Sequence, residues 1–174
     1  MFRRLLSTHQ KANLGSTVDQ LRCSIPLLLQ RPLPSHLIHQ NIRLELFPET
    51  HAIEAHGKSA YKVSILILQK ALSLFVLPPH SQLMILSACS KEVGDDTSFS
   101  MYWRTTNDSG RVQELPPLSP GKILETLNLG PAEYPILAGS FEFRFNQECD
   151  QVLAHVVRNV EFLARPQVSV EGAA

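Results

Sequence analysis

Residues 58–77 read KSAYKVSILILQKALSLFVL, and this stretch decides how the rest of the chain has to fold. Its apolar side chains recur at helical spacing, and the residues on this stripe are Tyr61, Ile65, Leu68, Leu72 and Phe75. Pro78 and Pro79 follow and cannot continue a helix. The stretch therefore predicts one long amphipathic helix, whose apolar stripe has to be covered by other elements.

The region before this helix predicts a hairpin and an earlier helix. Residues 42–47 (IRLELF) alternate apolar and polar side chains, which is typical of a half-buried strand, and residues 52–56 are its expected partner. Further upstream, Ser16 and Asp19 have the spacing of a helix cap. Pro26 predicts a bend or an end in the helix that follows this cap.

After the long helix, the period of the pattern changes from helical to two. Residues 83–88, 99–104 and 141–145 alternate along predicted strands, and residues 152–163 form a long apolar closing strand. Five prolines interrupt residues 107–137, which we expect to be an irregular surface excursion. The predicted fold class is α+β, with a curved antiparallel sheet wrapped around N-terminal helices.

The start of the chain has the composition of a mitochondrial leader. Residues 1–18 contain three basic residues, several hydroxyl residues and no acid, and they lack the long apolar core of a secretory signal. A frayed basic terminus is the alternative. We expect a leader at residues 1–15 with a mature chain starting near Gly15, a domain at 16–163, a loose tail at 164–174, and localisation in the mitochondrial matrix.

Composition excludes several classes of function. The 174 residues have a formal net charge of zero, so no overall positive field attracts nucleic acid. No apolar run is long enough to span a membrane. The three cysteines show no metal-ligand spacing, and no phosphate-binding, dinucleotide or metalloprotease motif is present in the sequence. We therefore expect neither a metal nor a cofactor.

Three stretches resemble one superfamily. Residues 39–48 (HQNIRLELFP), 57–61 (GKSAY) and 141–160 (FEFRFNQECDQVLAHVVRNV) look like the first strand, the helix start and the final hairpin of the nuclear transport factor 2-like superfamily. This superfamily is also called SnoaL-like or ketosteroid-isomerase-like. Residues 101–104 (MYWR) and 155–160 (HVVRNV) more narrowly resemble an uncharacterised family of organellar proteins.

The resemblance implies a cone-shaped pocket at the open end of the sheet, but it does not imply the isomerase reaction. Ketosteroid isomerases keep a general-base aspartate before the proline of the first hairpin, and that place is Phe47 here. Their acidic oxyanion donor falls on or near Phe141. Proton abstraction beside a carbonyl needs a base and a donor, and phenylalanine supplies neither. Whether the chain is an enzyme stays open at this point, with the residues favouring the view that it is not.

Four residues are candidates for lining the pocket: Tyr61, Trp103, His155 and Asn159. His155 and Asn159 lie four apart on a predicted strand and should share a face. Core packing is the alternative for the aromatic residues, and a structural role is the alternative for His155. Because the opposite strand face is more apolar, we expect that a homodimer could form through the outer face of the sheet.

A possible metal cluster is rejected on geometry. Glu49, His51, Glu54 and His56 lie near the first hairpin, but they alternate between the two sides of a strand and cannot converge.

Two functions remain open. One is a non-catalytic binding or assembly module in mitochondria, with a protein partner or a ligand. The other is an enzyme or carrier for a small apolar ligand, with His155 as the acid–base group. A deep, enclosed cavity that reaches His155 would favour the second function. A cone filled by Phe47, Phe141 and Phe143 would favour the first.

Overall fold

The computed structural model describes residues 7–50, 52–78, 80–93, 96–106 and 136–163. Two α-helices and six strands follow one another along the chain. Their order and bounds are α1 (Thr8–Ser24), a 3-10 turn (Ile25–Leu27), β1 (Ile38–Leu46), β2 (Ile53–His56), α2 (Lys58–Phe75), β3 (Gln82–Val93), β4 (Asp96–Thr106), β5 (Ile136–Phe145) and β6 (Val152–Leu163).

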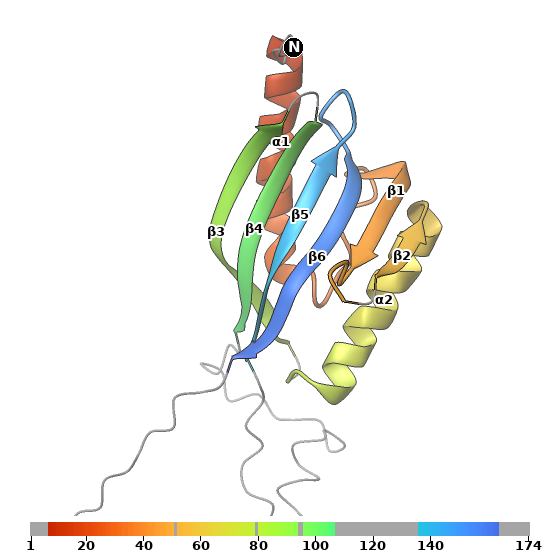
Figure 1. Ribbon diagram of the computed structural model, residues 1–174, viewed down its shortest axis with the longest axis vertical. Coiled ribbons are helices and arrows are strands. Elements are labelled where there is room, and N and C mark those ends of the chain that lie inside the picture. Colours follow the sequence, from red (N-terminus) through yellow and green to blue (C-terminus); the bar gives the residue numbers. More distant parts are fainter. Residues whose placement is uncertain (1–6, 51, 79, 94–95, 107–135, 164–174) are drawn as a thin grey trace, which may run out of the picture.

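The six strands form one curved sheet in the order β2-β1-β6-β5-β4-β3 (Figure 1). All neighbouring pairs are antiparallel except β1 and β6, which run parallel with Leu44 opposite His155. The predicted α+β class is confirmed, but the sheet is mixed rather than wholly antiparallel. The reason is that the last strand of the chain inserts between the first strand and the β3–β5 meander, a pairing that no local sequence pattern encodes.

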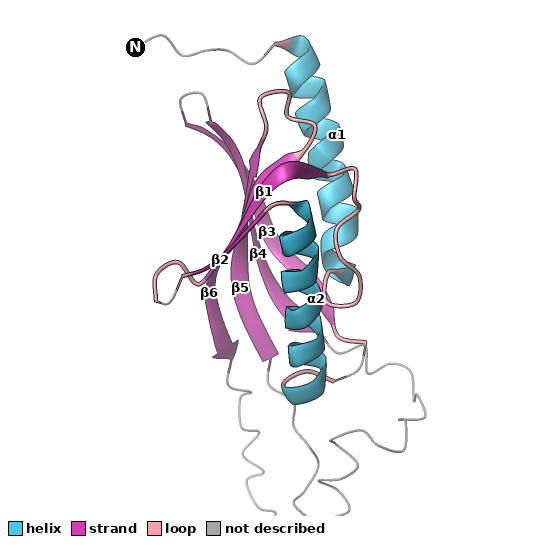
Figure 2. Ribbon diagram, turned by 90° about the vertical axis from the view of Figure 1, so that its right-hand side faces the viewer, coloured by secondary structure: helices cyan, strands magenta, loops and turns pink. Residues whose placement is uncertain are grey.

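Both helices lie on the same face of the sheet (Figure 2). The predicted long helix is confirmed, and Tyr61 and Ile65 on its stripe are buried. The stripe ends earlier than expected, because Phe75 in the last turn is 84% exposed. Gly57 precedes α2 with φ of 87°, a backbone conformation that favours glycine.

Helix α1 begins eight residues before the predicted cap at Ser16. Ser7 is the N-cap, and its side chain and that of Gln10 form a reciprocal capping box. The prediction at Pro26 is confirmed, because this proline lies in the 3-10 turn that ends the helix. The first half of α1 therefore lies within the predicted leader.

Three side chains on one face of α1 hold it to the turn between β5 and β6. The Gln10 amide donates to Gln147 O (2.9 Å), the Asn13 amide to Glu148 O (2.9 Å), and the Thr17 hydroxyl to Cys149 O (3.0 Å). Donors spaced three and four residues apart on one helix face thus meet three consecutive carbonyl groups.

The remaining predicted strands are longer in the structure than expected, and other predicted segments lie outside the described residues. The strands predicted at 83–88 and 99–104 extend to β3 and β4, and residues 136 and 137 of the predicted excursion belong to β5. Residues 107–135 of that excursion, the tail at 164–174 and the turn at 94–95 lie outside the described residues.

Candidate functional site

A buried hydrogen bond joins α2 to β6. The hydroxyl of Tyr61 lies 3.1 Å from Nδ1 of His155, and both side chains are fully buried. Burial lowers the pKa of His155 to about 3, because the apolar surroundings disfavour the charged imidazolium. The same cause raises the pKa of the Tyr61 hydroxyl. At neutral pH the pair is therefore uncharged.

Aromatic rings surround His155 on the inner face of the sheet. The ring of Phe143 stacks on the imidazole at 4.5 Å between centroids, and Phe141 meets it edge-on at 5.0 Å. Trp103 on β4 packs against Phe141 at 5.0 Å. The backbone of Gly139 allows this packing, since a Cβ atom there would lie 2.7 Å from the Trp103 ring.

An apolar cavity lies between these rings and α2. The space open to the centre of a water-sized molecule is about 80 Å³, several times the minimum needed to hold one water. Its wall is apolar apart from three side chains with polar atoms, Gln69, Trp103 and His155. The apolar wall residues are Leu28, Leu29, Phe47, Ile65, Leu68, Leu72, Leu83, Leu137, Phe141, Val157 and Val160.

Two polar atoms of the wall residues have no hydrogen-bond partner among the described residues. They are Nε2 of His155 and the indole Nε1 of Trp103, and both are buried. A buried polar group without a partner costs roughly 1–3 kcal/mol. Gln69 differs, because its amide donates to Leu28 O at 2.6 Å and so ties α2 to the segment after the 3-10 turn. Sequence reasoning missed Gln69, since a single glutamine on a helix gives no signal of its partner.

The four candidate pocket residues do not all meet. Trp103 and His155 line the cavity, and Tyr61 contacts His155. Asn159 is exposed and borders a separate hollow with Glu49 and Arg158.

The expectation that His155 and Asn159 share one face is wrong. The pairing of β5 with β6 shifts register between Ala138 and Ser140, and Asn159, close to this shift, has a left-handed backbone conformation with φ of 50°. Asparagine tolerates this conformation better than most residues.

Both positions where the resemblance suggested acids line the cavity, and both hold phenylalanine. Phe47 follows β1 with a left-handed backbone (φ 54°), and Phe141 lies on β5. Among the described residues, no carboxylate borders this cavity. Aromatic rings thus narrow the cone without filling it. The expected cavity at His155 and the expected filling of the cone by phenylalanine are therefore each met in part.

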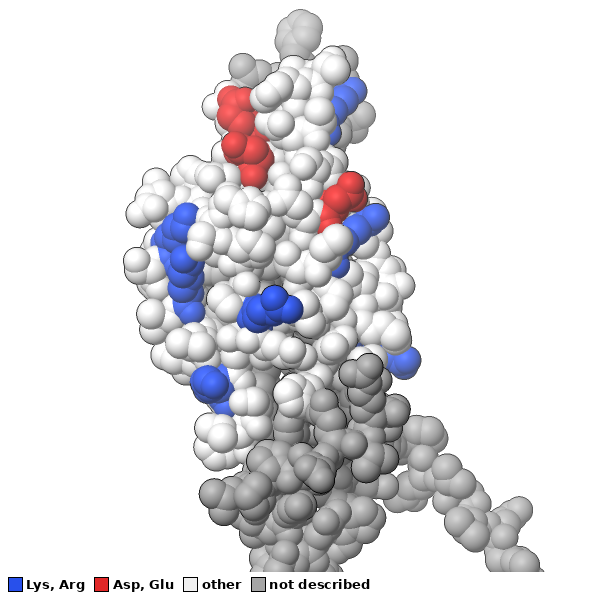
Figure 3. Space-filling view, turned by 180° about the vertical axis from the view of Figure 1, so that it is seen from behind, with Lys and Arg blue, Asp and Glu red and all other residues white. Residues whose placement is uncertain are grey.

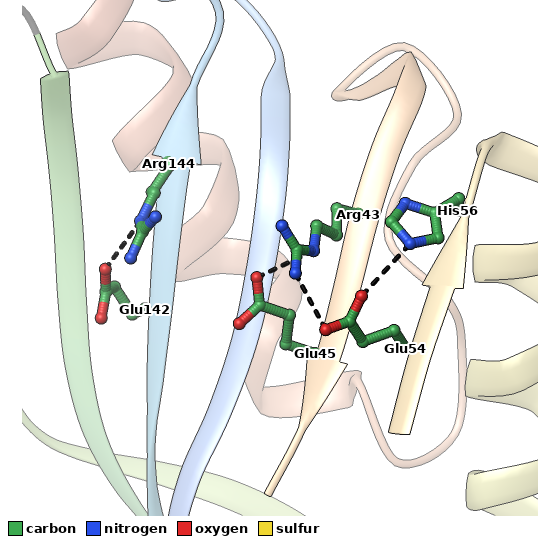
Figure 4. A network of polar contacts seen from close by, with 6 residues as sticks. All are labelled: Arg43, Glu45, Glu54, His56, Glu142 and Arg144. Carbon is green, nitrogen blue, oxygen red and sulfur yellow. Dashed lines mark hydrogen bonds and ion pairs between the residues drawn. The ribbon is translucent and has the colours of Figure 1, made fainter. Parts of the chain in front are cut away.

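The outer face of the sheet carries a network of ion pairs (Figure 4). Arg43 contacts Glu45 at 3.0 Å and Glu54 at 2.9 Å, and His56 lies 3.3 Å from Glu54. The hydrogen bond from Arg43 lowers the pKa of the Glu54 carboxyl. Arg43, Glu54 and His56 keep 39–65% of their side chains exposed, so the pairs among them add little stability. Within the described part of the chain, no three His, Cys, Asp or Glu side chains gather in a metal-binding arrangement; His51 lies outside it.

The cone fold is shared with proteins of the nuclear transport factor 2-like class. One similar structure is an NTF2-like protein of unknown function from Pseudomonas putida KT2440, with a TM-score of 0.52 and 11% identity over 93% of this chain and 100% of that chain. Another is an NTF2-like protein of unknown function from Mesorhizobium loti, with a TM-score of 0.51 and 10% identity over 90% and 97% of the two chains. At these identities the likeness defines the fold alone, and it confirms the cone fold that the resemblance implied.

By sequence, the chain belongs to the family described as mitochondrial protein up-regulated during meiosis (MMU163), whose sequence model matches residues 6–107. An uncharacterised protein of Saccharomyces cerevisiae is 34% identical over 91 residues. The match covers 50% of this chain and 32% of the yeast protein, so this chain spans about a third of its relative. The family name refers to a mitochondrial protein, and the family is uncharacterised, as the sequence suggested.

Proposed function

We propose that the chain is a mitochondrial binding module, whose cone holds a small, uncharged apolar molecule without reacting with it. The observation that carries this proposal is the neutral Tyr61–His155 pair beside an apolar cavity. An imidazole whose pKa is lowered to about 3 is a weak general base at neutral pH, because efficient acid–base catalysis needs a pKa near the working pH. The pair is suited to binding rather than to proton transfer.

The unpartnered nitrogen atoms indicate the polar part of such a ligand. The indole N–H of Trp103 can only donate, so it needs an acceptor. When the Tyr61 hydroxyl donates to Nδ1 of His155, Nε2 of the neutral ring also carries a hydrogen. A ligand with one carbonyl, ether or hydroxyl oxygen would suit these donors. A carboxylate would not, since no cation borders the cavity within the described ranges.

The test uses Trp103, which is the only tryptophan of the chain, as the reporter of occupancy. We expect 2-undecanone to shift its emission, and native mass spectrometry with lipid extraction to detect any molecule retained from the cell. Leu72→Phe, which fills the cavity, should weaken binding at least tenfold. Val63→Phe, on the exposed side of the same helix, should leave binding unchanged. The absence of both a retained molecule and an emission shift would refute ligand binding.

The second candidate function is an enzyme with His155 as its acid–base group. Two observations are in its favour: His155 lines the cavity, and its Nε2 atom has no hydrogen-bond partner among the described residues. Under this alternative, the rate of turnover of a retained ligand would depend on pH as the titration of a single group, His155. The His155→Phe variant would lose turnover but would still bind the ligand. A retained ligand that the purified protein leaves unchanged would count against it.

We also propose that residues 1–18 direct the protein to the mitochondrial matrix, which the composition of the leader and the family name support. Cleavage near Gly15 would remove the contacts of Gln10 and Asn13 with the β5–β6 turn. A fluorescent fusion to residues 1–30 should enter mitochondria, and a diffuse cytosolic signal would contradict the proposal. The intact mass of the imported protein locates the cut.

A homodimer through the outer sheet face stays a proposal with less support. Arg43, Glu45, Glu142 and Arg144 cover part of that face with charge (Figure 4). Subunit counting by native mass spectrometry tests it, and a monomer at all concentrations would end it.

A further inference from the structure

The outer face of α2 is apolar although it points away from the sheet. Val63, Leu66, Ile67 and Leu74 lie on this side and are 51–63% exposed. Eleven large apolar side chains are exposed among the described residues, and four of them are these neighbours on one side of one helix. Figure 2 shows α2 in front of the sheet with no other described element covering it. A concentration of this kind on one element indicates an interaction surface.

The charges on α2 have a single sign. The helix contains Lys58, Lys62 and Lys70 and no acidic residue, in a chain whose formal net charge is zero. The surface around the helices carries charge of the same sign. In Figure 3, the lower half of the described surface shows Lys and Arg but no Asp or Glu. A partner of this surface therefore has to accept apolar side chains and to bring negative charge.

We propose that α2 docks by its outer face on an anionic lipid surface. Val63, Ile67 and Leu74 lie on one side of the helix at helical spacing and would enter the headgroup region, with Lys70 of the same side on a lipid phosphate. The contact is peripheral: within the described residues, no helix has the length and apolarity to cross a bilayer. This inference is independent of the cavity and of any ligand in it.

Two other occupants fit the surface less well. A second copy docked through the same face would bring the two Lys70 side chains together without an acid from either α2, and like charges at an interface oppose association. A protein partner is disfavoured by composition, because protein interfaces are depleted in Lys, whereas membrane-surface helices combine Lys with Leu and Phe.

The experiment is co-flotation of the full chain with vesicles of phosphatidylcholine alone, and with an equimolar mixture of phosphatidylcholine and phosphatidylglycerol. We expect flotation with the anionic vesicles only, weakened by salt. The Val63→Ser/Ile67→Ser double variant should bind at least about tenfold more weakly, because two apolar side chains no longer leave water. Lys70→Ser should bind about fivefold more weakly, since one lysine near an anionic surface contributes about this factor.

The matched control is Leu86→Ser/Tyr102→Ser on β3 and β4, where the side chains are 55% and 54% exposed. Its flotation should equal that of the wild type, which separates a specific helix face from general apolar adhesion. The basic residues of the leader are present in every variant, so they cannot produce the difference.

Four outcomes would overturn the proposal. They are no flotation with anionic vesicles, an equal loss in the control variant, a dimer that the Val63→Ser/Ile67→Ser variant dissolves, and a marked loss of thermal stability in that variant. The third outcome would assign the face to a second copy. The fourth would show that another segment of the same chain covers it.

Discussion

The two helices pack on the same face of one sheet and are held there by different forces. Helix α1 buries only Thr17, Val18 and Leu21, and polar donors along its length fix it to a turn. Helix α2 is held by buried side chains and by Tyr61, yet it keeps further apolar residues on its solvent side. Apolar side chains that a helix does not need for its packing, as on α2, therefore indicate a functional surface. A polar helix such as α1 can still be an integral part of a fold.

The largest expected effect concerns the anchor of α2. Tyr61→Ala should lower the free energy of unfolding by roughly 3–5 kcal/mol, because it leaves a large cavity in the core. Tyr61→Phe removes only the hydroxyl and leaves Nδ1 of His155 buried without its partner, so it should cost about 1–3 kcal/mol. Urea denaturation measures both. Equal losses in the two variants would show that the hydroxyl alone accounts for the anchoring.

The next effect is a dependence of stability on pH. The pKa of His155 is about 3 in the fold and 6.5 without perturbation, so between these values the unfolded chain binds a proton that the folded chain does not. The free energy of unfolding should therefore fall as pH falls from about 6.5, by up to about 1.4 kcal/mol per pH unit. The difference between wild type and His155→Phe isolates this slope from that of the carboxylates. Parallel curves for the two proteins would contradict the neutral buried imidazole.

A smaller effect is expected at the anchor of α1. Thr17→Val keeps the shape of the side chain but removes the hydroxyl that donates to Cys149 O, so the free energy of unfolding should drop by about 1 kcal/mol. Asn13→Ala, whose bond to Glu148 O is exposed, should cost less. Thermal unfolding followed by circular dichroism measures both. A greater loss in Asn13→Ala than in Thr17→Val would reverse this ranking.

The smallest effect is expected on the outer face of α2. The Val63→Ser/Ile67→Ser variant should change the free energy of unfolding by no more than about 0.5 kcal/mol per site, because more than half of each side chain is already in water. A large loss of unfolding free energy in Tyr61→Ala and a small loss in this variant would show that the inner side of α2 stabilises the fold. The outer side would then be free to serve a function.

Much of the fold could be predicted from local patterns. The stripe of Tyr61 and Ile65, the alternation around Phe143 and the break at Pro26 each depend on neighbours along the chain, and each appears in the structure. The start of α1 was misplaced, although Ser7 and Gln10 have the same cap spacing as Ser16 and Asp19. The basic composition of that segment favoured a leader and concealed the helix cap.

The site was predictable only in part. His155 stood out as a polar side chain within an apolar strand and Trp103 as an aromatic side chain with a polar group, and both border the cavity. Asn159 was misjudged because the pairing of β5 with β6 shifts register beside it, so counting alternate residues from His155 no longer gives the face of Asn159.

The sequence by itself determined the element types, the α+β fold class and the presence of Phe47 and Phe141 where the resemblance suggested acids, since these depend on residue type and spacing within single segments. Only the tertiary structure decided that β6 lies beside β1, that Tyr61 meets His155 across 94 positions, and which side of α2 remains in water. The physical reason is that burial and hydrogen bonding depend on which distant surfaces meet, and pairing across a long loop is set by the packing of the whole core.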